Sequence, residues 1–221
     1  MPQIARKIPI VPGNPVMTSC SASFEFETIS KDKPDISELY RKTSQPVAVL
    51  GGGPSLPSDM AQIPEDCLLI SCNHHAFRLC SPDYMAFIDD PDMIKSIAFR
   101  SITISCSCPK ISVNLKWTDY YCLNEFPINI LHPLGVSDTG MFGTWLASYI
   151  TSGPVYLCGM DITRNNGQEH FYQSDSNSGW KDDIHLESKL IKWQHIINFC
   201  ENVERIKAIS GPLQKVLNEL Q

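Results

Sequence analysis

Short apolar segments recur along this chain, and most of them end at a glycine or at a polar side chain. The segment PVAVL runs into Gly51–Gly53, CLLISC runs into Asn73, and VYLC runs into Gly159. Stretches with helical spacing of apolar residues lie between several of these segments. This alternation is typical of an α/β protein in which helices cover both faces of a mostly parallel sheet. The expected fold class is therefore a single, doubly wound α/β domain.

The spacing of apolar residues places the individual elements. Strands are expected over residues 46–50, 67–72, 84–89, 101–106, 128–132, 154–159 and 205–210. Helices are expected over residues 35–42, 91–99, 139–151, 185–203 and 212–220, with Ser137 or Asp138 as the N-cap of the helix over 139–151. Residues 1–34 are expected to form an N-terminal arm or extended segment, and residues 35–221 the single domain.

Composition limits the class of protein. The 221 residues carry a formal net charge of −6, which argues against a large non-specific nucleic-acid face. No apolar run is long enough to cross a membrane. The nine cysteines include no Cys-x-x-Cys pair and favour buried free thiols in a reducing compartment over metal ligands. We therefore expect a cytoplasmic protein.

The carboxyl ends of the strands are where a ligand is expected. In an open parallel sheet, ligands bind outside these ends, so residues far apart in the sequence meet at one edge. A turn of successive glycines after a strand can present backbone N–H groups to a phosphate. The sequence GGGPSL lacks both the Lys-Ser/Thr ending of a P-loop and the Gly-x-Gly-x-x-Gly pattern. By itself it fits a structural tight turn as well as a phosphate site.

The order of several short motifs resembles a known superfamily. VLGGGPSL, SCNHHAF, AFIDDPDM, SDTGMFGTWLASYI and VYLCGMDITRNNGQEHF follow one another between about residues 46 and 200. This order is similar to that of the superfamily containing the bacterial lipooligosaccharide sialyltransferases and the 6-hydroxymethylpterin diphosphokinase-like (MptE-like) proteins. The resemblance implies a Rossmann-like nucleotide-binding domain that holds a nucleotide-activated donor.

The resemblance also implies a set of donor contacts. These are Gly52, Gly53, Ser55, Asn73, Thr139, Gly140, Gly159 and Asp161. The candidate set further includes Gly51 and Asp89 at the same sheet edge, and Ser137 at the start of the helix over 139–151.

The two branches of the superfamily imply different chemistry. The sialyltransferase branch uses a histidine as general base after a mobile lid, which here points to His185, with Tyr156 and Tyr172 available to stabilise a leaving phosphate. The tyrosine that this branch carries after its Gly-x-Asp motif is absent, because the chain reads GMDITR. The diphosphokinase branch would use ATP with Mg²⁺. Asp89 and Asp90 are the candidate metal ligands for this chemistry, and His170 is a second candidate catalytic histidine.

Several of these residues have an ordinary structural alternative. Asn73 and Asp161 could close turns, and Asp89 and Asp90 could cap a helix that begins near Pro91. One of His74 and His75 could touch the ligand, whereas His195 is expected to pack in the core. His132 is expected to be a strand-end residue.

Three functions follow as hypotheses. The first is a transferase that moves a sugar or related group from a nucleotide-activated donor to a hydroxyl-bearing acceptor, with His185, His170 and Asp161 as candidate catalytic residues. The second is an MptE-like diphosphokinase that transfers diphosphate from ATP to a hydroxymethyl-pterin-like or nucleoside-like acceptor. The third is an inactive nucleotide-binding module. A nucleic-acid acceptor and a homo-oligomer both stay open.

Overall fold

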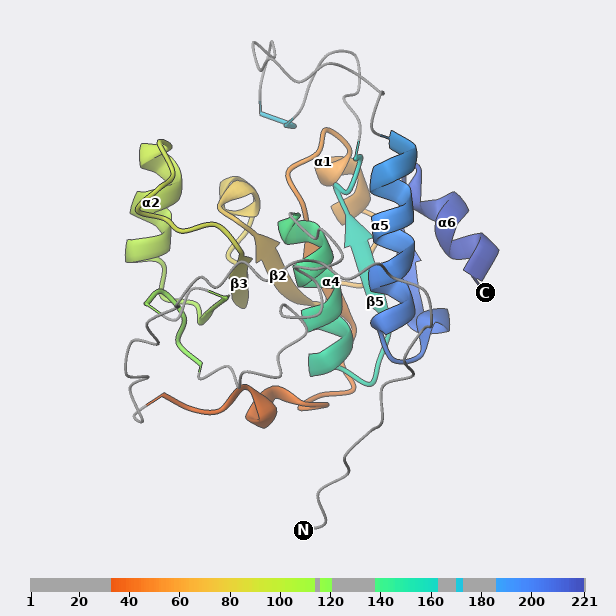
Figure 1. Cartoon of the computed structure of the whole chain (residues 1–221), viewed down its shortest axis with the longest axis horizontal. Helices are drawn as coiled ribbons and strands as arrows, with labels where there is room; N and C mark the ends of the chain where they lie inside the picture. The colour runs from red at the N-terminus through yellow and green to blue at the C-terminus, as the bar shows by residue number, and fades with distance from the viewer. Residues whose placement is uncertain (1–32, 114–115, 121–137, 163–169, 173–185, 221) are drawn as a thin grey trace, which may run out of the picture.

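The sheet consists of six parallel strands in the order β4-β3-β2-β1-β5-β6. The computed structural model describes residues 33–113, 116–120, 138–162, 170–172 and 186–220 (Figure 1). The strands are β1 Val47–Leu50, β2 Leu68–Cys72, β3 Tyr84–Phe87, β4 Lys110–Ser112, β5 Val155–Cys158 and β6 Ile206–Ala208. The predicted α/β fold with a parallel sheet is confirmed.

The helices lie between strands along the chain, except α6, which follows the last strand. They are α1 Leu56–Met60, α2 Ile97–Ser105, α4 Thr139–Ile150, α5 Leu186–Phe199 and α6 Leu213–Leu220. Short 3₁₀ turns are η1 Ile36–Leu39, η2 His75–Arg78 and η3 Val203–Arg205. No described helix has both the length and the apolar character needed to span a membrane.

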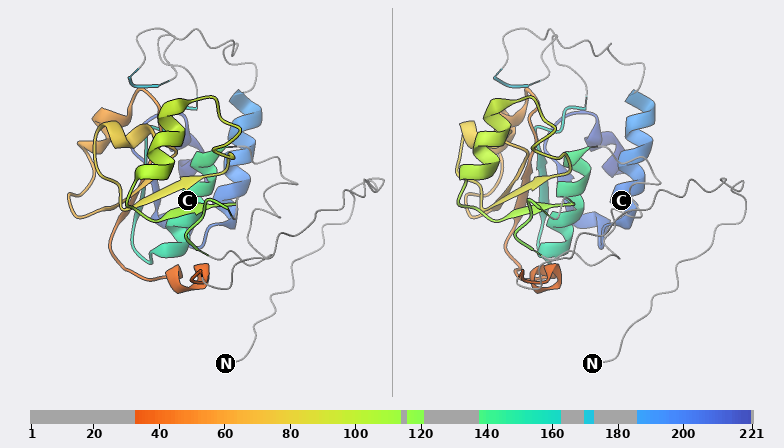
Figure 2. Two further views of the ribbon diagram at one scale, coloured as in Figure 1. Left: turned by 90° about the vertical axis from the view of Figure 1, so that its left-hand side faces the viewer. Right: turned by 60° about the vertical axis from the view of Figure 1, so that its left-hand side comes forward.

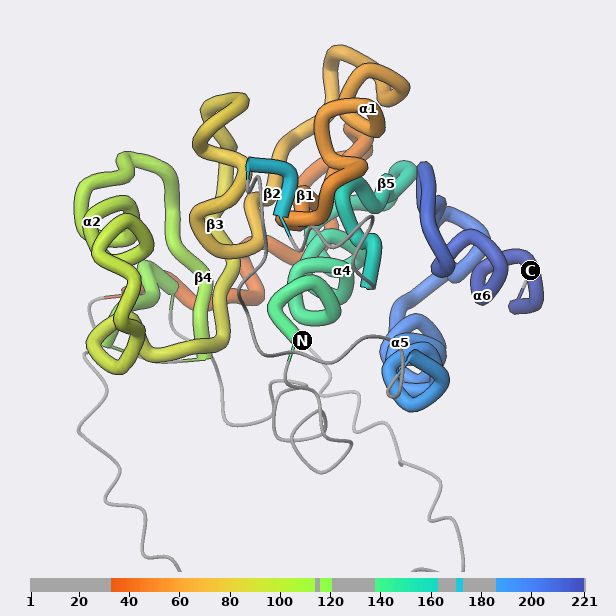
Figure 3. Tube along the Cα trace, turned by 90° about the horizontal axis from the view of Figure 1, so that it is seen from above, coloured from red at the N-terminus to blue at the C-terminus, as the bar shows by residue number. Residues whose placement is uncertain are grey.

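Alternate residues of β1 pack into different clusters. Val47 and Val49 pack with residues of α4, α5 and α6, whereas Ala48 and Leu50 pack with Leu56 of α1. Successive strand side chains point to opposite faces of a sheet, so these helices cover opposite faces. Seen from above, α1 lies on one side of the strands, and α4 and α5 lie on the other (Figure 3). Figure 2 shows α2 and α5 at opposite sides of the molecule, with α4 between them.

The strand order reverses at β1. The chain adds β2, β3 and β4 on one side of β1 and then returns to place β5 and β6 on the other side. Parallel pairing on both sides aligns Leu50 of β1 with Cys158 of β5 and with Ser71 of β2. A crevice between β1 and β5 at their carboxyl ends is the expected ligand position in such a sheet.

Two predicted elements are wrong. The predicted strand over 101–106 is the second half of α2, and the helix predicted over 91–99 begins only at Ile97. Ser96 caps α2, because its side chain accepts a hydrogen bond from the Phe99 amide. The alternating Ser-Ile-Thr-Ile-Ser pattern suggested a strand with one buried face. On the helix, however, only Phe99 and Thr103 are buried, and they lie one helical turn apart on the same face. Consequently Asp89 and Asp90 do not cap a helix near Pro91, where the chain makes a turn.

Other predictions need smaller changes. The strand β4 at Lys110–Ser112 was not predicted, and the predicted strand over 128–132 lies outside the described residues. The helix expected over 35–42 is only the 3₁₀ turn η1. His195 is exposed on α5, which contradicts its expected place in the core, whereas its neighbours Trp193 and Ile196 are buried.

The cysteines follow the expectation wherever they are described. Cys67, Cys72, Cys158 and Cys200 are buried free thiols, and Cys80, Cys106 and Cys108 are half-buried free thiols. Burial raises the pKa of the Cys158 thiol to about 12, which keeps it protonated and unreactive.

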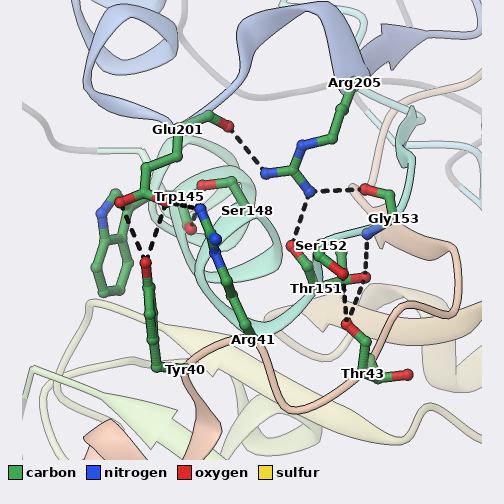
Figure 4. A network of polar contacts seen from close by, with 10 residues as sticks. All are labelled: Tyr40, Arg41, Thr43, Trp145, Ser148, Thr151, Ser152, Gly153, Glu201 and Arg205. Atoms are coloured by element: carbon green, nitrogen blue, oxygen red, sulfur yellow. Dashed lines mark hydrogen bonds and ion pairs between the residues drawn. The ribbon is translucent and has the colours of Figure 1, made fainter.

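The opposite edge of the sheet is held by the half-buried Arg205. Arg205 Nη1 donates to the carbonyl oxygens of Thr151 and Gly153 at 2.8 and 2.9 Å, and Nη2 donates to Glu201 O at 3.0 Å (Figure 4). These contacts join the loop before β5 to the end of α5. They lie at the amino-terminal edge of β5 and serve the fold rather than the candidate site.

Candidate functional site at the carboxyl edge of the sheet

The triple-glycine turn after β1 is bound to the end of β5. Gly51 N donates to Cys158 O at 2.8 Å, and Gly53 N donates to Gly159 O at 2.9 Å. A Cβ atom at Gly53 would overlap Asp161 Oδ2, so no side chain fits there. The glycines therefore let two strand ends meet in close contact at the position where the strand order reverses.

Asp161 occupies the inner side of this turn. Its Oδ2 accepts hydrogen bonds from both the amide and the hydroxyl of Ser55, each at 3.0 Å. The amides of Gly51 and Gly53 are thus engaged within the protein, and so is that of Ser55. The expectation that the successive glycines Gly51–Gly53 present their amides to a phosphate needs correction at Gly51 and Gly53, because carbonyl groups at the end of β5 already accept from them.

A second carboxylate, Asp59, is hydrogen-bonded to the turn after β1 and was not identified from the sequence. Asp59 is 1% exposed, and its Oδ2 accepts from Ser55 Oγ at 2.8 Å, Gly159 N at 2.9 Å and Ser210 Oγ at 2.9 Å. It links the turn after β1 with the ends of β5 and β6. Its only sequence signal is the Ser-x-x-x-Asp spacing, which puts both side chains on one face of α1.

Asn73 and the start of α4 form the next part of the edge. Asn73 has a positive φ of 57° directly after β2, a conformation that asparagine tolerates better than most residues. Its Oδ1 accepts from Thr139 Oγ1 at 3.3 Å. Asp138 is the N-cap of α4, and its Oδ1 accepts from Gly140 N at 2.8 Å. The structure thereby brings Asn73, Thr139 and Gly140 together, and Ser137 lies outside the described residues.

The neighbouring carboxylates Asp89 and Asp90 have different surroundings. Asp90 Oδ1 accepts from Trp117 Nε1 at 3.2 Å and from Asp92 N at 2.8 Å, so Asp90 stabilises its own turn. Asp89 is exposed as a residue, but its carboxyl group is partly desolvated, and this raises the pKa of the group. Burial also raises the pKa of Asp138, and the negative charge of Asp89 adds to this effect. Within the part of the chain that the structure describes, no group of three His, Cys, Asp or Glu residues could hold a metal ion.

Aromatic side chains stack over the outer side of the glycine turn. His75 and His170 stack with ring centroids 4.3 Å apart, and His75 Nδ1 lies 3.0 Å from Tyr172 Oη. The segment 170–172 lies beside the turn after β1 (Figure 3). It is attached there, because Phe171 N donates to Gly52 O at 3.1 Å. A Cβ atom at Gly52 would lie 2.8 Å from both imidazole rings. Gly52 therefore faces histidines, whereas Gly53 faces Asp161.

The histidine stack continues on both sides. His74 is 8% exposed, and its ring centroid lies 4.6 Å from that of His75. Arg78 lies over the Tyr172 ring, 4.1 Å from its centroid. His74 and His75 were only weakly indicated by the sequence and Arg78 was not indicated, because their contacts depend on a segment nearly one hundred positions further along.

The histidines of η2 are held neutral by their surroundings. Burial first, and then the basic groups Arg78 and His170, lower the pKa of His74 to about 4. Burial first, and then the basic groups His170, His74 and Arg78, lower the pKa of His75 to about 3. Among the described residues, the charged groups that act on these two pKa values are all basic.

Acidification is therefore expected to destabilise the folded protein. Between about pH 6.5 and pH 4, the unfolded chain protonates His74 and His75 while the folded chain resists, so stability falls as pH falls. Each histidine should cost about 1–2 kcal/mol of unfolding free energy by about pH 5. Urea unfolding at neutral and acidic pH measures this, and His74→Gln should flatten the pH dependence. The exposed His195→Gln is the control, and an equal flattening in both variants would refute the assignment.

His185, His132 and residues 163–169 lie outside the described residues.

At the end of β5, Gly159 and Ile162 have φ values of 65° and 61°. Positive φ is strained for a β-branched residue such as isoleucine, and such strain is found preferentially at functional sites.

Comparison of the chain with family models, with curated proteins and with solved structures gave no match.

Proposed function

We propose that this protein is a transferase that uses a nucleotide-activated donor and transfers a sugar or related group to a hydroxyl-bearing acceptor. The observation that carries the proposal is the convergence at the β1/β5 reversal of the glycine turn, Asp161 and His170. Ligand pockets of doubly wound sheets form at such a reversal. The resemblance of the ordered motifs to the sialyltransferase and MptE-like superfamily supports the choice of donor.

Each of the described residues at this edge has a proposed role in binding the donor. Gly52 faces the histidine side, where the phosphate of a donor would lie, and Asp161 fixes the turn from the other side. Asn73 and Thr139 offer an amide and a hydroxyl for the transferred group. An exposed carboxylate such as Asp89 suits a ribose hydroxyl. These groups together would orient a donor along the edge of the sheet.

His170 is the proposed general base within the described part of the chain. An imidazole can accept the proton of an acceptor hydroxyl near neutral pH while the new bond to the transferred group forms. His170 lies at the turn that would hold the donor phosphate, since a Cβ atom on Gly52 would lie 2.8 Å from its Nδ1. His185 stays the second candidate for this role.

The exposed Asp89 at the same edge of the sheet bears on one alternative. Its carboxylate is an oxygen ligand of the kind that Mg²⁺ prefers. Mg²⁺ bound there would neutralise phosphate charge in a diphosphate transfer from ATP. Loss of activity in EDTA would favour this diphosphokinase, whereas activity that persists in EDTA would favour glycosyl transfer.

Isothermal titration with CMP, UDP, GDP and ATP species, with and without Mg²⁺, tests the proposal. We expect one of them to bind, and Asp161→Asn to weaken that binding by about tenfold or more, equivalent to about 1.4 kcal/mol. Asn keeps one oxygen that can accept from Ser55, so the melting temperature should change little. Glu219→Gln on the exposed face of α6 is the matched control.

Two results would contradict the proposal. Absence of binding by every nucleotide would reject a nucleotide-dependent function altogether. The inactive binding module would be favoured if a nucleotide binds, the corresponding donor is not turned over, and His170→Gln changes no activity.

A further inference from the structure

The side chains stacked over Gly52 form a compact basic cluster. We define the histidine cluster as His74, His75, His170, Tyr172 and Arg78. Ring centroids of successive members lie 4.6, 4.3 and 5.4 Å apart from His74 through His75 and His170 to Tyr172. The Arg78 guanidinium group closes the stack 4.1 Å from the centroid of Tyr172.

Stacking of this kind has an electrostatic cost. Within the described part of the chain, the charged groups that shift the pKa of His74 or His75 are basic, and each lowers it. His74 Nδ1 is also buried without a hydrogen-bond partner among the described residues, although His74 itself is 8% exposed. A buried polar atom without a partner costs about 1–3 kcal/mol, so it calls for an explanation such as a catalytic role or a bound ion.

We propose that the histidine cluster is a binding site for a phosphoryl group, and that the cluster takes up a proton when this anion binds. Arg78, imidazole N–H groups and the Tyr172 hydroxyl are the donors that such an anion requires. The inference deepens the proposed function by naming where the phosphoryl group binds, and it rests on that function only for the identity of the physiological ligand.

The proton uptake follows from the charges. A bound dianion favours the protonated imidazole, because it supplies the negative charge that His74 and His75 lack. Arg78 and His170 are the basic groups that act on both rings, Tyr172 Oη lies 3.0 Å from His75 Nδ1, and Asp161 lies on the other side of the turn. By linkage, binding must then tighten as pH falls.

Sulfate is a suitable probe, because it stays a dianion throughout the relevant pH range. We expect sulfate to bind about tenfold or more tightly at about pH 5.5 than at about pH 7.5. Titration calorimetry in two buffers of different ionisation enthalpy should show net proton uptake. Arg78→Gln and His75→Gln should each weaken sulfate binding about tenfold, and His195→Gln should bind as the wild type does.

The proposal is overturned if sulfate binding does not depend on pH, or if Arg78→Gln and His75→Gln both bind sulfate as the wild type does. Should His75→Gln fail to fold, Arg78→Gln decides alone, because Arg78 is exposed and its loss leaves the core intact.

Competition identifies the source of the phosphoryl group. A nucleoside diphosphate that displaces sulfate assigns the cluster to the donor, whereas displacement by a sugar phosphate assigns it to a phosphorylated acceptor. The same data separate this inference from the proposed function. Sulfate binding with proton uptake but no nucleotide binding would reject only the function, and nucleotide binding with sulfate binding that is independent of pH would reject only the cluster.

Discussion

Gly53→Ala is expected to destabilise the folded protein by about 3 kcal/mol, the upper range for an overpacked buried site. A methyl group at this position would overlap Asp161 Oδ2 and lie 2.7 Å from Gly159 O. The carboxylate could rotate away, but it would then lose its hydrogen bonds to Ser55. The carbonyl group belongs to the backbone at the end of β5 and cannot move without breaking the bond from Gly53 N.

Urea unfolding measures this loss, and Gly211→Ala is the matched control. The nearest atoms to a Cβ on Gly211 lie at 3.6 Å, so only its positive φ of 77° opposes the substitution, at about 1–2 kcal/mol. Equal stability losses in the two variants would contradict the close contact between Gly53 and the end of β5. Gly53→Ala should also weaken nucleotide binding, because Asp161 and the turn could no longer meet.

Asp59→Ala is expected to cost about 3 kcal/mol or more of unfolding free energy. Three donors lose this acceptor when the carboxylate is removed, namely Ser55 Oγ, Gly159 N and Ser210 Oγ, and of these the Gly159 amide is fully buried. An unsatisfied buried donor costs about 1–3 kcal/mol, and Ser55 Oγ keeps a partner in Asp161. We expect the loss of stability to affect the ends of all three strands that Asp59 joins, namely β1, β5 and β6.

Asp59→Asn separates the role of the oxygen from that of the charge. All three donors point to Oδ2, whereas Oδ1 is buried without a partner among the described residues. An amide oxygen can replace Oδ2, and the amide nitrogen then takes the position of Oδ1. We expect Asp59→Asn to lose only about 1 kcal/mol, the value of a typical hydrogen bond. A loss as large as that of Asp59→Ala would mean that the negative charge itself is required.

The sequence predicted the edge of the sheet better than the contacts on it. Apolar segments that end at Gly51, Asn73 and Gly159 indicated three strand ends, and parallel pairing then brings them to one edge. The turn was predicted as a possible phosphate site. What could not be predicted is that Asp161 already accepts from Ser55, since that contact joins residues 106 positions apart.

The errors have physical causes. Residues 101–105 alternate between apolar and polar side chains, yet the Ser96 cap and the packing of Phe99 make them helical. His195 was placed in the core because its neighbours are apolar, but the core-facing stripe of α5 contains Trp193, Ile196 and Ile197 instead. Asp59 and Arg78 were missed because their importance lies in contacts with distant segments.

The most direct test of the account is a ¹H–¹⁵N titration of the protein with the nucleotide that binds best. We predict that the largest shifts occur at Gly52, Gly53, Ser55, Asp161 and His75, around the β1/β5 reversal. Shifts confined to the amino-terminal edge around Thr151 and Arg205, or to the exposed face of α6, would contradict the claim that the carboxyl edge of the sheet binds a phosphorylated ligand.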